Sequence, residues 1–232
     1  MNNNVTEKKP KVMIGLPTMG SLHTLLVSII LKWMSDAMNS GSYGLSVYPT
    51  MSVQPVDNAR NHIVEEFLKS DCTHLLFVDS DTLPPYNALQ KLLLQNKDII
   101  SGLTPIIEHD ENRKNDSNGY YRKLNVVGLN DKFVEPYLGT IEVKGAGSSC
   151  ILIKREVFEK MQKPYYRFQY QDDNGKYVVI GEDILFTIKA KELGFKIWAD
   201  TSLICKHEKT IPWSLAFFYL LLHASLFLGI MS

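Results

Sequence analysis

Two aspartates stand two positions apart directly after a short apolar run. Residues 75–78 read Leu-Leu-Phe-Val, and Asp79, Ser80 and Asp81 follow them. If the apolar run is a buried strand, a turn at its end lets both carboxylates face one cleft. Hard divalent cations are usually held by one or two carboxylates together with substrate phosphates. The pattern indicates a site for Mn²⁺ or Mg²⁺, and a plain turn in which Asp81 caps the next helix is the alternative.

A second acidic pair, Glu182 and Asp183, follows Gly181 at the predicted start of a helix. Carboxylates are favoured at this position by the helix dipole, so the pair has a simple structural explanation. Beside a metal site it also has a chemical one, because a metal-assisted group transfer needs a general base.

His207 and Arg60 complete the set of candidate residues. His207 lies in the polar segment 205–209, where it is either a ligand or a structural histidine. Arg60 lies early on a predicted helix. It is expected to meet a diphosphate or to pair with an aspartate, unless it is a solvated surface charge.

The elements that must position these residues alternate along the chain. Strands are predicted at 12–16, 43–48, 75–78 and 98–101, and helices at 22–38, at 58–69 with Asp57 as N-cap, and from Pro84 to Gln95. This alternation predicts a mostly parallel sheet covered by helices, with ligands beyond the carboxyl ends of the strands. Shorter strands follow, including 150–154, then a helix at 182–193 that ends before Gly194, and a strand at 195–199. The expected fold class is α/β, with a central mixed sheet flanked by helices.

Bulk composition narrows the classes of partner. The 232 residues are 45% hydrophobic and carry 25 basic and 25 acidic side chains, so no global basic field attracts nucleic acid. Cys72, Cys150 and Cys205 are far apart and show no zinc spacing, and the last two lie in apolar runs typical of buried thiols. A reducing cytoplasm is therefore expected.

Several longer segments resemble known enzymes. The segments are "IGLPTMG", "DNARNHIVEEFL", "HLLFVDSDTLPP", "GAGSSCILIKREVFEKM" and "GEDILFTIKAKELGFKIWADTSLICKH". In this order and spacing they resemble the GT-A glycosyltransferases, in particular small bacterial and phage members of the family two-like group. The resemblance covers about residues 12–209.

The resemblance implies a role for each matching residue. Asp79 and Asp81 match the DxD motif that holds Mn²⁺ or Mg²⁺ on a sugar-nucleotide diphosphate, and His207 matches a later metal or diphosphate contact. Asp183 matches the general base of inverting members, with Glu182 as its positioning neighbour. The nucleotide pocket is expected to include Pro17, Thr18, Asp57, Arg60, Asp79, Ser80 and Asp81. Residues 145–149 match the acceptor-side floor, whereas Met19, Gly20 and Leu22 depart from the polar residues that usually contact the base.

The predicted function is transfer of a sugar from a nucleotide-diphosphate sugar, with UDP-sugar favoured, to an acceptor hydroxyl. Inversion at the anomeric carbon is favoured over retention. One alternative is a phosphatase of the haloacid dehalogenase type, with Asp79 as nucleophile and Asp81 as acid and base. Its motif normally follows the first strand, however, and its later GDxxxD motif is missing here. The other alternative is a non-catalytic protein with the sugar-nucleotide fold.

Three regions are expected along the chain. Residues 1–10 are predicted to be a disordered N-terminus without a signal peptide, 11–210 the catalytic domain, and 211–232 a hydrophobic helix. The last region has no charged residue over 22 positions, which is long enough to cross a bilayer, and membrane association is favoured over burial. The acceptor is then an unknown glycan, lipid-linked molecule or protein. Residues 108–121 form a polar, glycine-containing stretch that is predicted to be a mobile loop helping to bind this acceptor.

Overall fold

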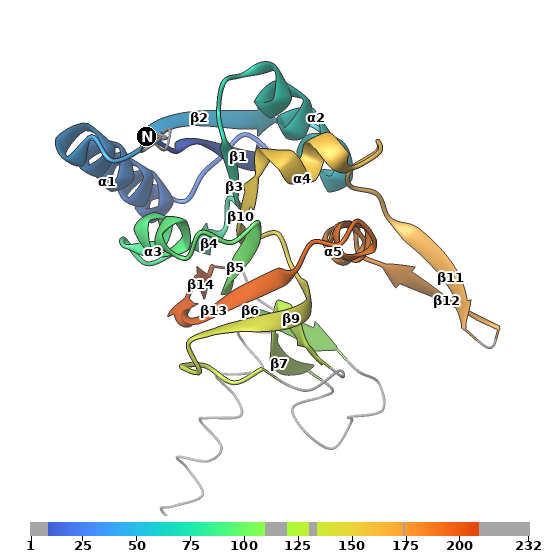
Figure 1. Ribbon diagram of the computed structural model, residues 1–232. Helices are drawn as coiled ribbons and strands as arrows, with labels where there is room; N and C mark the ends of the chain where they lie inside the picture. The colour runs from blue at the N-terminus through green and yellow to red at the C-terminus, as the bar shows by residue number, and fades with distance from the viewer. Residues whose placement is uncertain (1–8, 110–119, 130–133, 174, 209–232) are drawn as a thin grey trace, which may run out of the picture.

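The computed structural model describes residues 9–109, 120–129, 134–173 and 175–208. These residues form an α/β fold around an eight-stranded mixed sheet, as the sequence predicts (Figure 1). β1 pairs in parallel with β2 and β3, and β5 with β13, whereas β10 is antiparallel to both of its neighbours. β9 is antiparallel to β13 and to β8. The spatial order of the strands is β2 (Gly44–Met51), β1 (Lys11–Thr18), β3 (His74–Val78), β10 (Cys150–Lys154), β5 (Ile99–Leu103), β13 (Ile197–Ile204), β9 (Thr140–Ala146), β8 (Val126–Gly128).

Helices cover both faces of this sheet (Figure 1). α1 (Thr24–Ser40) and α3 (Ala88–Leu94) each bury one apolar face in a core cluster shared with β1. The opposite face is covered by α2 (Val56–Lys69), α4 (Arg155–Lys160) and α5 (Glu182–Glu192), which share the second core cluster.

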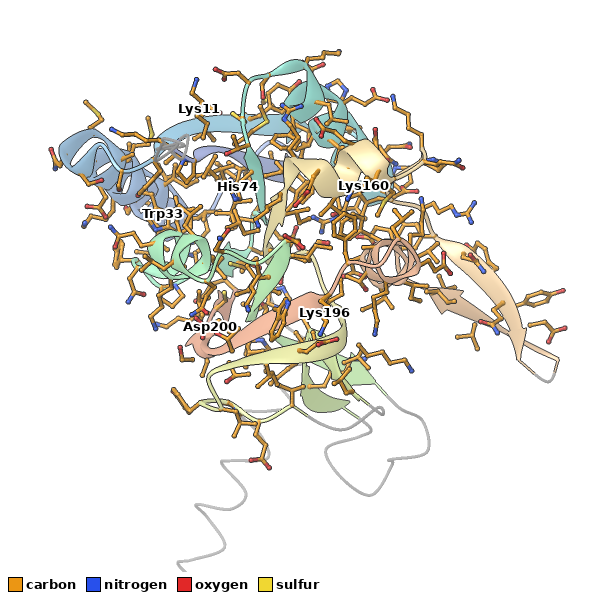
Figure 2. All side chains as sticks on the ribbon, in the orientation of Figure 1. Lys11, Trp33, His74, Lys160, Lys196 and Asp200 are labelled. Atoms are coloured by element: carbon orange, nitrogen blue, oxygen red, sulfur yellow. The ribbon has the colours of Figure 1, made fainter. Side chains whose placement is uncertain are left out.

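β3 explains why two cores form. Leu75 and Phe77 point into the cluster under α2 and α5, whereas Leu76 and Val78 point into the cluster under α1 and α3. Successive strand residues face opposite sides, so a central strand covered on both faces is apolar at every position. Trp33 joins α1 to the segment just before α3, because its indole nitrogen donates to the carbonyl oxygen of Tyr86 at 2.6 Å (Figure 2).

Short two-stranded sheets accompany the main sheet. β4 (Thr82–Leu83) pairs with β14 (Lys206–His207), and β6 (Pro105–His109) pairs with β7 (Tyr120–Leu124). A hairpin of β11 (Gln169–Asp173) and β12 (Lys176–Ile180) projects from the body immediately before α5 (Figure 1).

Two local predictions are wrong. Asp57 is not the N-cap of α2, because the helix begins at Val56 and Pro55 is the extended residue before it. Asp57 lies in the first turn, where its carboxylate still interacts with the helix dipole. α3 begins at Ala88 instead of Pro84, and Thr82 and Leu83 before it are extended and pair with His207 and Lys206.

Other predictions concern regions that lie partly or wholly outside the described residues. The predicted loop 108–121 has strand residues of β6 and β7 at both ends, and its centre, 110–119, lies outside the described residues. Most of the predicted N-terminal region and all of 211–232 also lie outside them. Within the described part, no helix combines the length and hydropathy needed to cross a membrane. Cys72, Cys150 and Cys205 are free and buried.

Candidate active site

A buried arginine holds three segments together at the carboxyl end of β3. Arg60 is only 3% exposed. Its Nη2 donates to Oδ1 of Asp79 at 2.9 Å, and its Nε donates to Oε1 of Glu182 at 3.1 Å. Its Nη1 donates to the carbonyl oxygen of Ser148 at 3.4 Å. One guanidinium therefore connects the end of β3, the start of α5 and the segment before β10. Of the roles expected for Arg60, the structure shows pairing with an aspartate.

Aromatic rings enclose this guanidinium. Its carbon lies 5.3 Å from the centre of the Phe77 ring and 5.9 Å from that of Tyr166. Tyr166 is stacked on Phe186, with ring centres 4.7 Å apart. The side chain of Asn61 holds the backbone of Tyr166 through two hydrogen bonds of 2.7 and 3.0 Å. The arginine and the acids that it binds are thus supported by packed, rigid neighbours.

The local charge is acidic despite Arg60. Burial by itself would lower the pKa of Arg60, but the carboxylates of Asp79 and Glu182 raise it. Burial also raises the pKa of Asp79; Arg60 opposes this shift, while the charges of Asp81 and Asp183 add to it. The pKa of Glu182 is raised in the same way, by burial and by Asp183. Because these carboxylates repel one another, a cation among them would be favoured.

His207 reaches the second aspartate of the predicted motif. β14 pairs with β4, which brings Nε2 of His207 to 3.2 Å from Oδ2 of Asp81. Nδ1 of His207 lies 2.9 Å from the carbonyl oxygen of Pro105. A carbonyl only accepts hydrogen bonds, so Nδ1 carries a proton. A carboxylate also only accepts, so Nε2 donates to Asp81 in the doubly protonated ring, whereas in the neutral ring the Nε2 lone pair is available to a metal ion held between His207 and Asp81. Metal-binding histidines are commonly oriented in this way, by a second-nitrogen hydrogen bond to the backbone.

The chemistry of this donor set suits Mn²⁺ or Mg²⁺. Asp79 and Asp81 offer carboxylate oxygens, and His207 offers an imidazole nitrogen. Among the residues that the structure describes, no group of three or more His, Cys, Asp or Glu side chains is arranged to hold a metal ion. Sites for Mg²⁺ in nucleotide enzymes usually use one or two carboxylates and complete the shell with water and substrate phosphates.

Asp183 lies where two close-packed segments meet. Its Oδ1 accepts from the backbone nitrogen of Ile184 at 2.7 Å. A Cβ atom on Gly147 would lie 3.1 Å from Oδ2 of Asp183 and 3.1 Å from the Cβ of Asn125. The segment 145–149, expected from the resemblance to be the acceptor-side floor, therefore touches the predicted base.

Three polar residues beside this glycine form a cluster that the sequence does not reveal. Asn125 accepts from the backbone nitrogen of Thr104 at 2.7 Å and donates to Oγ of Ser149 at 3.1 Å. The Ser149 hydroxyl donates in turn to Oγ1 of Thr104 at 2.8 Å. These residues come from three separate strand ends, and only Ser149 belongs to a segment that the sequence singles out.

The residues predicted for the nucleotide pocket lie at the same edge of the sheet, but they are spread along it. Pro17 and Thr18 end β1 beside Thr50 and Met51 of β2. Thr18 is buried and closes a turn, donating to the carbonyl oxygen of Ser21 at 2.6 Å. Asp57 accepts from the backbone nitrogen of Asn58 at 3.0 Å. Among the described residues, no hydrogen bond or ion pair joins the side chains of Thr18 and Asp57 to the acidic cluster.

A mainly apolar groove of about 490 Å³ lies at the opposite end of the sheet, between the starts of β1 and β2 and the segment 70–72. The salt bridge between Lys11 and Asp71 flanks it. It contains none of the predicted site residues, so the acidic edge remains the candidate site.

Comparison with known proteins identifies the fold. No protein-family model matches the sequence, and no curated protein matches it significantly. Among solved structures, A197 from STIV matches with a TM-score of 0.54 and 21% identity, over 87% of this chain and 86% of that one. GalNAc-T7, solved with UDP, GalNAc and Mn²⁺, matches with a TM-score of 0.52 and 11% identity, over 91% of this chain. The chain has a GT-A-like fold. It spans 45% of the length of GalNAc-T7.

Proposed function

We propose that this protein is a metal-dependent glycosyltransferase that moves a sugar from a nucleotide-diphosphate sugar, preferably a UDP-sugar, to an acceptor hydroxyl with inversion. The observation that best supports the proposal is the convergence of two distant acidic motifs on Arg60 within a GT-A-like fold. UDP and Mn²⁺ in the similar structure of GalNAc-T7 fit the same kind of donor and ion.

In this proposal the donor diphosphate lies beside Asp79, Asp81 and His207. These three residues would hold Mn²⁺ or Mg²⁺ together with the phosphate oxygens, and the metal would supply positive charge to the departing nucleotide diphosphate. Arg60 is a positioning residue, because its guanidinium is engaged by Asp79 and Glu182. Ser80, Pro17, Thr18 and Asp57 surround the rest of the nucleotide.

Asp183 is the proposed general base. Its carboxylate takes the proton from the acceptor hydroxyl as that oxygen forms a bond to the anomeric carbon of the sugar. The bond from the anomeric carbon to the diphosphate breaks on the opposite side, and the configuration inverts. Gly147 lies close to this carboxylate, and the neighbouring Glu182 is held by Arg60. The acceptor approaches past the segment 145–149 and the predicted loop 108–121.

Two other functions are less well supported. In a haloacid dehalogenase-type phosphatase Asp79 would attack phosphate, but here Oδ1 of Asp79 is bound by Arg60. In a non-catalytic binding protein, the close packing of Gly147 against Asp183 would serve no purpose. Membrane association through 211–232, with a cytoplasmic catalytic domain and a lipid-linked acceptor, remains part of the proposal.

Turnover of UDP-, GDP- and CMP-sugars with Mn²⁺ tests the function, with nucleotide release as the measurement. Asp183→Asn should reduce turnover by about 10²–10⁴-fold, because a general base contributes that much, and should leave donor binding nearly unchanged. Asp36→Asn, which alters a carboxylate on α1, is the matched control. Near-normal turnover of Asp183→Asn would exclude the proposed base. Hydrolysis of simple phosphate esters in place of sugar nucleotides would favour the phosphatase.

A further inference from the structure

α1 has two apolar stripes, and only one of them faces the sheet. Its buried stripe consists of Leu26, Ile29, Ile30, Trp33 and Ala37. The second stripe, here called the outer stripe, consists of Val27, Leu31, Met34 and Met38, which are 40%, 60%, 39% and 83% exposed. A surface helix normally needs one apolar face, so the outer stripe is unexplained by the fold.

The outer stripe is continuous along the helix. Its members are separated by four, three and four residues, which places them on the same side of an α-helix over about 16 Å. Apart from Leu25 at its start, the other exposed positions of α1, such as Ser28, Lys32 and Ser35, are polar. A contiguous exposed apolar surface of this kind usually marks a contact with another molecule or with lipid.

The described chain ends beside the start of this helix. The backbone nitrogen of Glu208 donates to the carbonyl oxygen of Asp81 at 2.8 Å. The neighbouring Ser80 accepts at its carbonyl oxygen from the backbone nitrogen of His23, the N-cap of α1, at 3.4 Å. The described chain therefore ends near the N-terminus of α1, and the uncharged run 211–232 follows it in the sequence.

We propose that α1 lies on a lipid bilayer, with the outer stripe in the interface and its polar positions towards water. As a helix, the run 211–232 would be apolar around nearly its whole circumference, so packing it on the outer stripe would leave most of its own surface exposed. A bilayer would cover both such a run and the outer stripe, as it does for interfacial amphipathic helices. This assignment does not depend on the sugar-transfer proposal.

An environment-sensitive dye on single cysteines tests the contact in the full chain. Cys72, Cys150 and Cys205 are buried, so an NBD label introduced with Met38→Cys reacts at the new thiol, and the labelled wild-type chain serves as the blank. Leu25→Cys is the matched control, because Leu25 is 50% exposed on the same helix but about 150° away from the outer stripe. The probe is a vesicle of phosphatidylcholine and phosphatidylglycerol.

NBD at position 38 should become several-fold brighter and shift to the blue when vesicles are added, whereas NBD at position 25 should not change. Equal responses at the two positions, or no response at position 38, would overturn the proposal. A position 38 label that is already bright before vesicles are added would also overturn it, because the chain's own C-terminal run or a second copy would then cover the stripe.

Discussion

At the scale of single residues, Arg60 determines how the acidic groups are arranged. It is nearly fully buried and binds Asp79 and Glu182, which are far apart in the sequence. A buried charge of this kind is tolerated only with partners, and each partner likewise needs the arginine. The three residues therefore depend on one another. Loss of one of them leaves the charges of the others in the interior without a compensating charge.

Arg60→Gln should destabilise the fold by about 3–5 kcal/mol, because it leaves the buried Glu182 and the partly buried Asp79 without a counter-charge. Arg60→Lys should retain part of the stability, since a lysine keeps the charge but cannot reproduce the forked contacts. Urea unfolding of the three proteins measures the difference. Equal unfolding free energies for Arg60→Gln and the wild type would show that the ion pairs contribute little.

Gly147→Ala should reduce turnover by about 10-fold or more, because a Cβ there crowds Asp183 and small displacements of catalytic groups are costly. Gly44→Ala is the control, since its Cβ would meet Lys11 at an ordinary 3.5 Å. Steady-state kinetics with saturating donor measures the effect. Full activity of Gly147→Ala would mean that the close approach has no bearing on the base.

At the scale of elements, each strand combines an apolar body with a functional end. β3 is buried along its length and delivers Asp79 at its carboxyl end, while His74 begins it at the other end (Figure 2). Burial lowers the pKa of His74 to about 4, and Lys154 adds to the shift. The neutral imidazole accordingly belongs to the packed start of β3, which lies away from the candidate site.

The lowered pKa of His74 predicts a pH dependence of stability. The folded value is about 4 and the ordinary value is 6.5, so its contribution is present above about pH 6.5 and is lost as the pH falls towards 4. His74→Gln should therefore weaken the loss of stability between pH 7 and pH 5. Denaturant midpoints at both pH values provide the measurement. Parallel losses in the variant and the wild type would contradict the assignment.

At the scale of the whole molecule, the mixed sheet gathers its polar residues at one edge. The parallel strands β1, β2 and β3 end there, and antiparallel β10 begins there, since the backbone nitrogen of Asp79 donates to the carbonyl oxygen of Ser149 at 3.0 Å. α2 and α5 also start at this edge. Binding of a donor with its metal at this edge should therefore stabilise the complete fold.

Saturating UDP with Mn²⁺ should raise the melting temperature by about 5–10 °C, because a ligand at a hundred times its Kd adds about 2.7 kcal/mol to stability. Removal of the metal with EDTA should abolish most of this increase, and Asp81→Asn should do the same. Asp172→Asn in the projecting hairpin is the control. A shift that persists without metal would show that nucleotide binding does not need the ion.

The sequence by itself determined the elements and the candidate acids. Apolar runs and helical spacing predicted β1, β3, β10 and α5, because these patterns depend on neighbours a few positions away. The position of Asp79 at a strand end and of Gly194 after α5 followed from the same local rules, and Gly194 indeed has a φ of 87°. Local patterns misplaced the start of α3, where a distant strand pairs with the chain.

Only the tertiary structure decided which distant residues meet. His207 and Asp81 are 126 positions apart and Arg60 and Glu182 are 122 apart, so their contacts depend on the strand order and on the packing of α2 and α5. The cluster of Thr104, Asn125 and Ser149 arises in the same way, from strand ends that share no local pattern. Hydrogen-bond partners across a sheet are selected by the three-dimensional register of its strands, which no short stretch of sequence encodes.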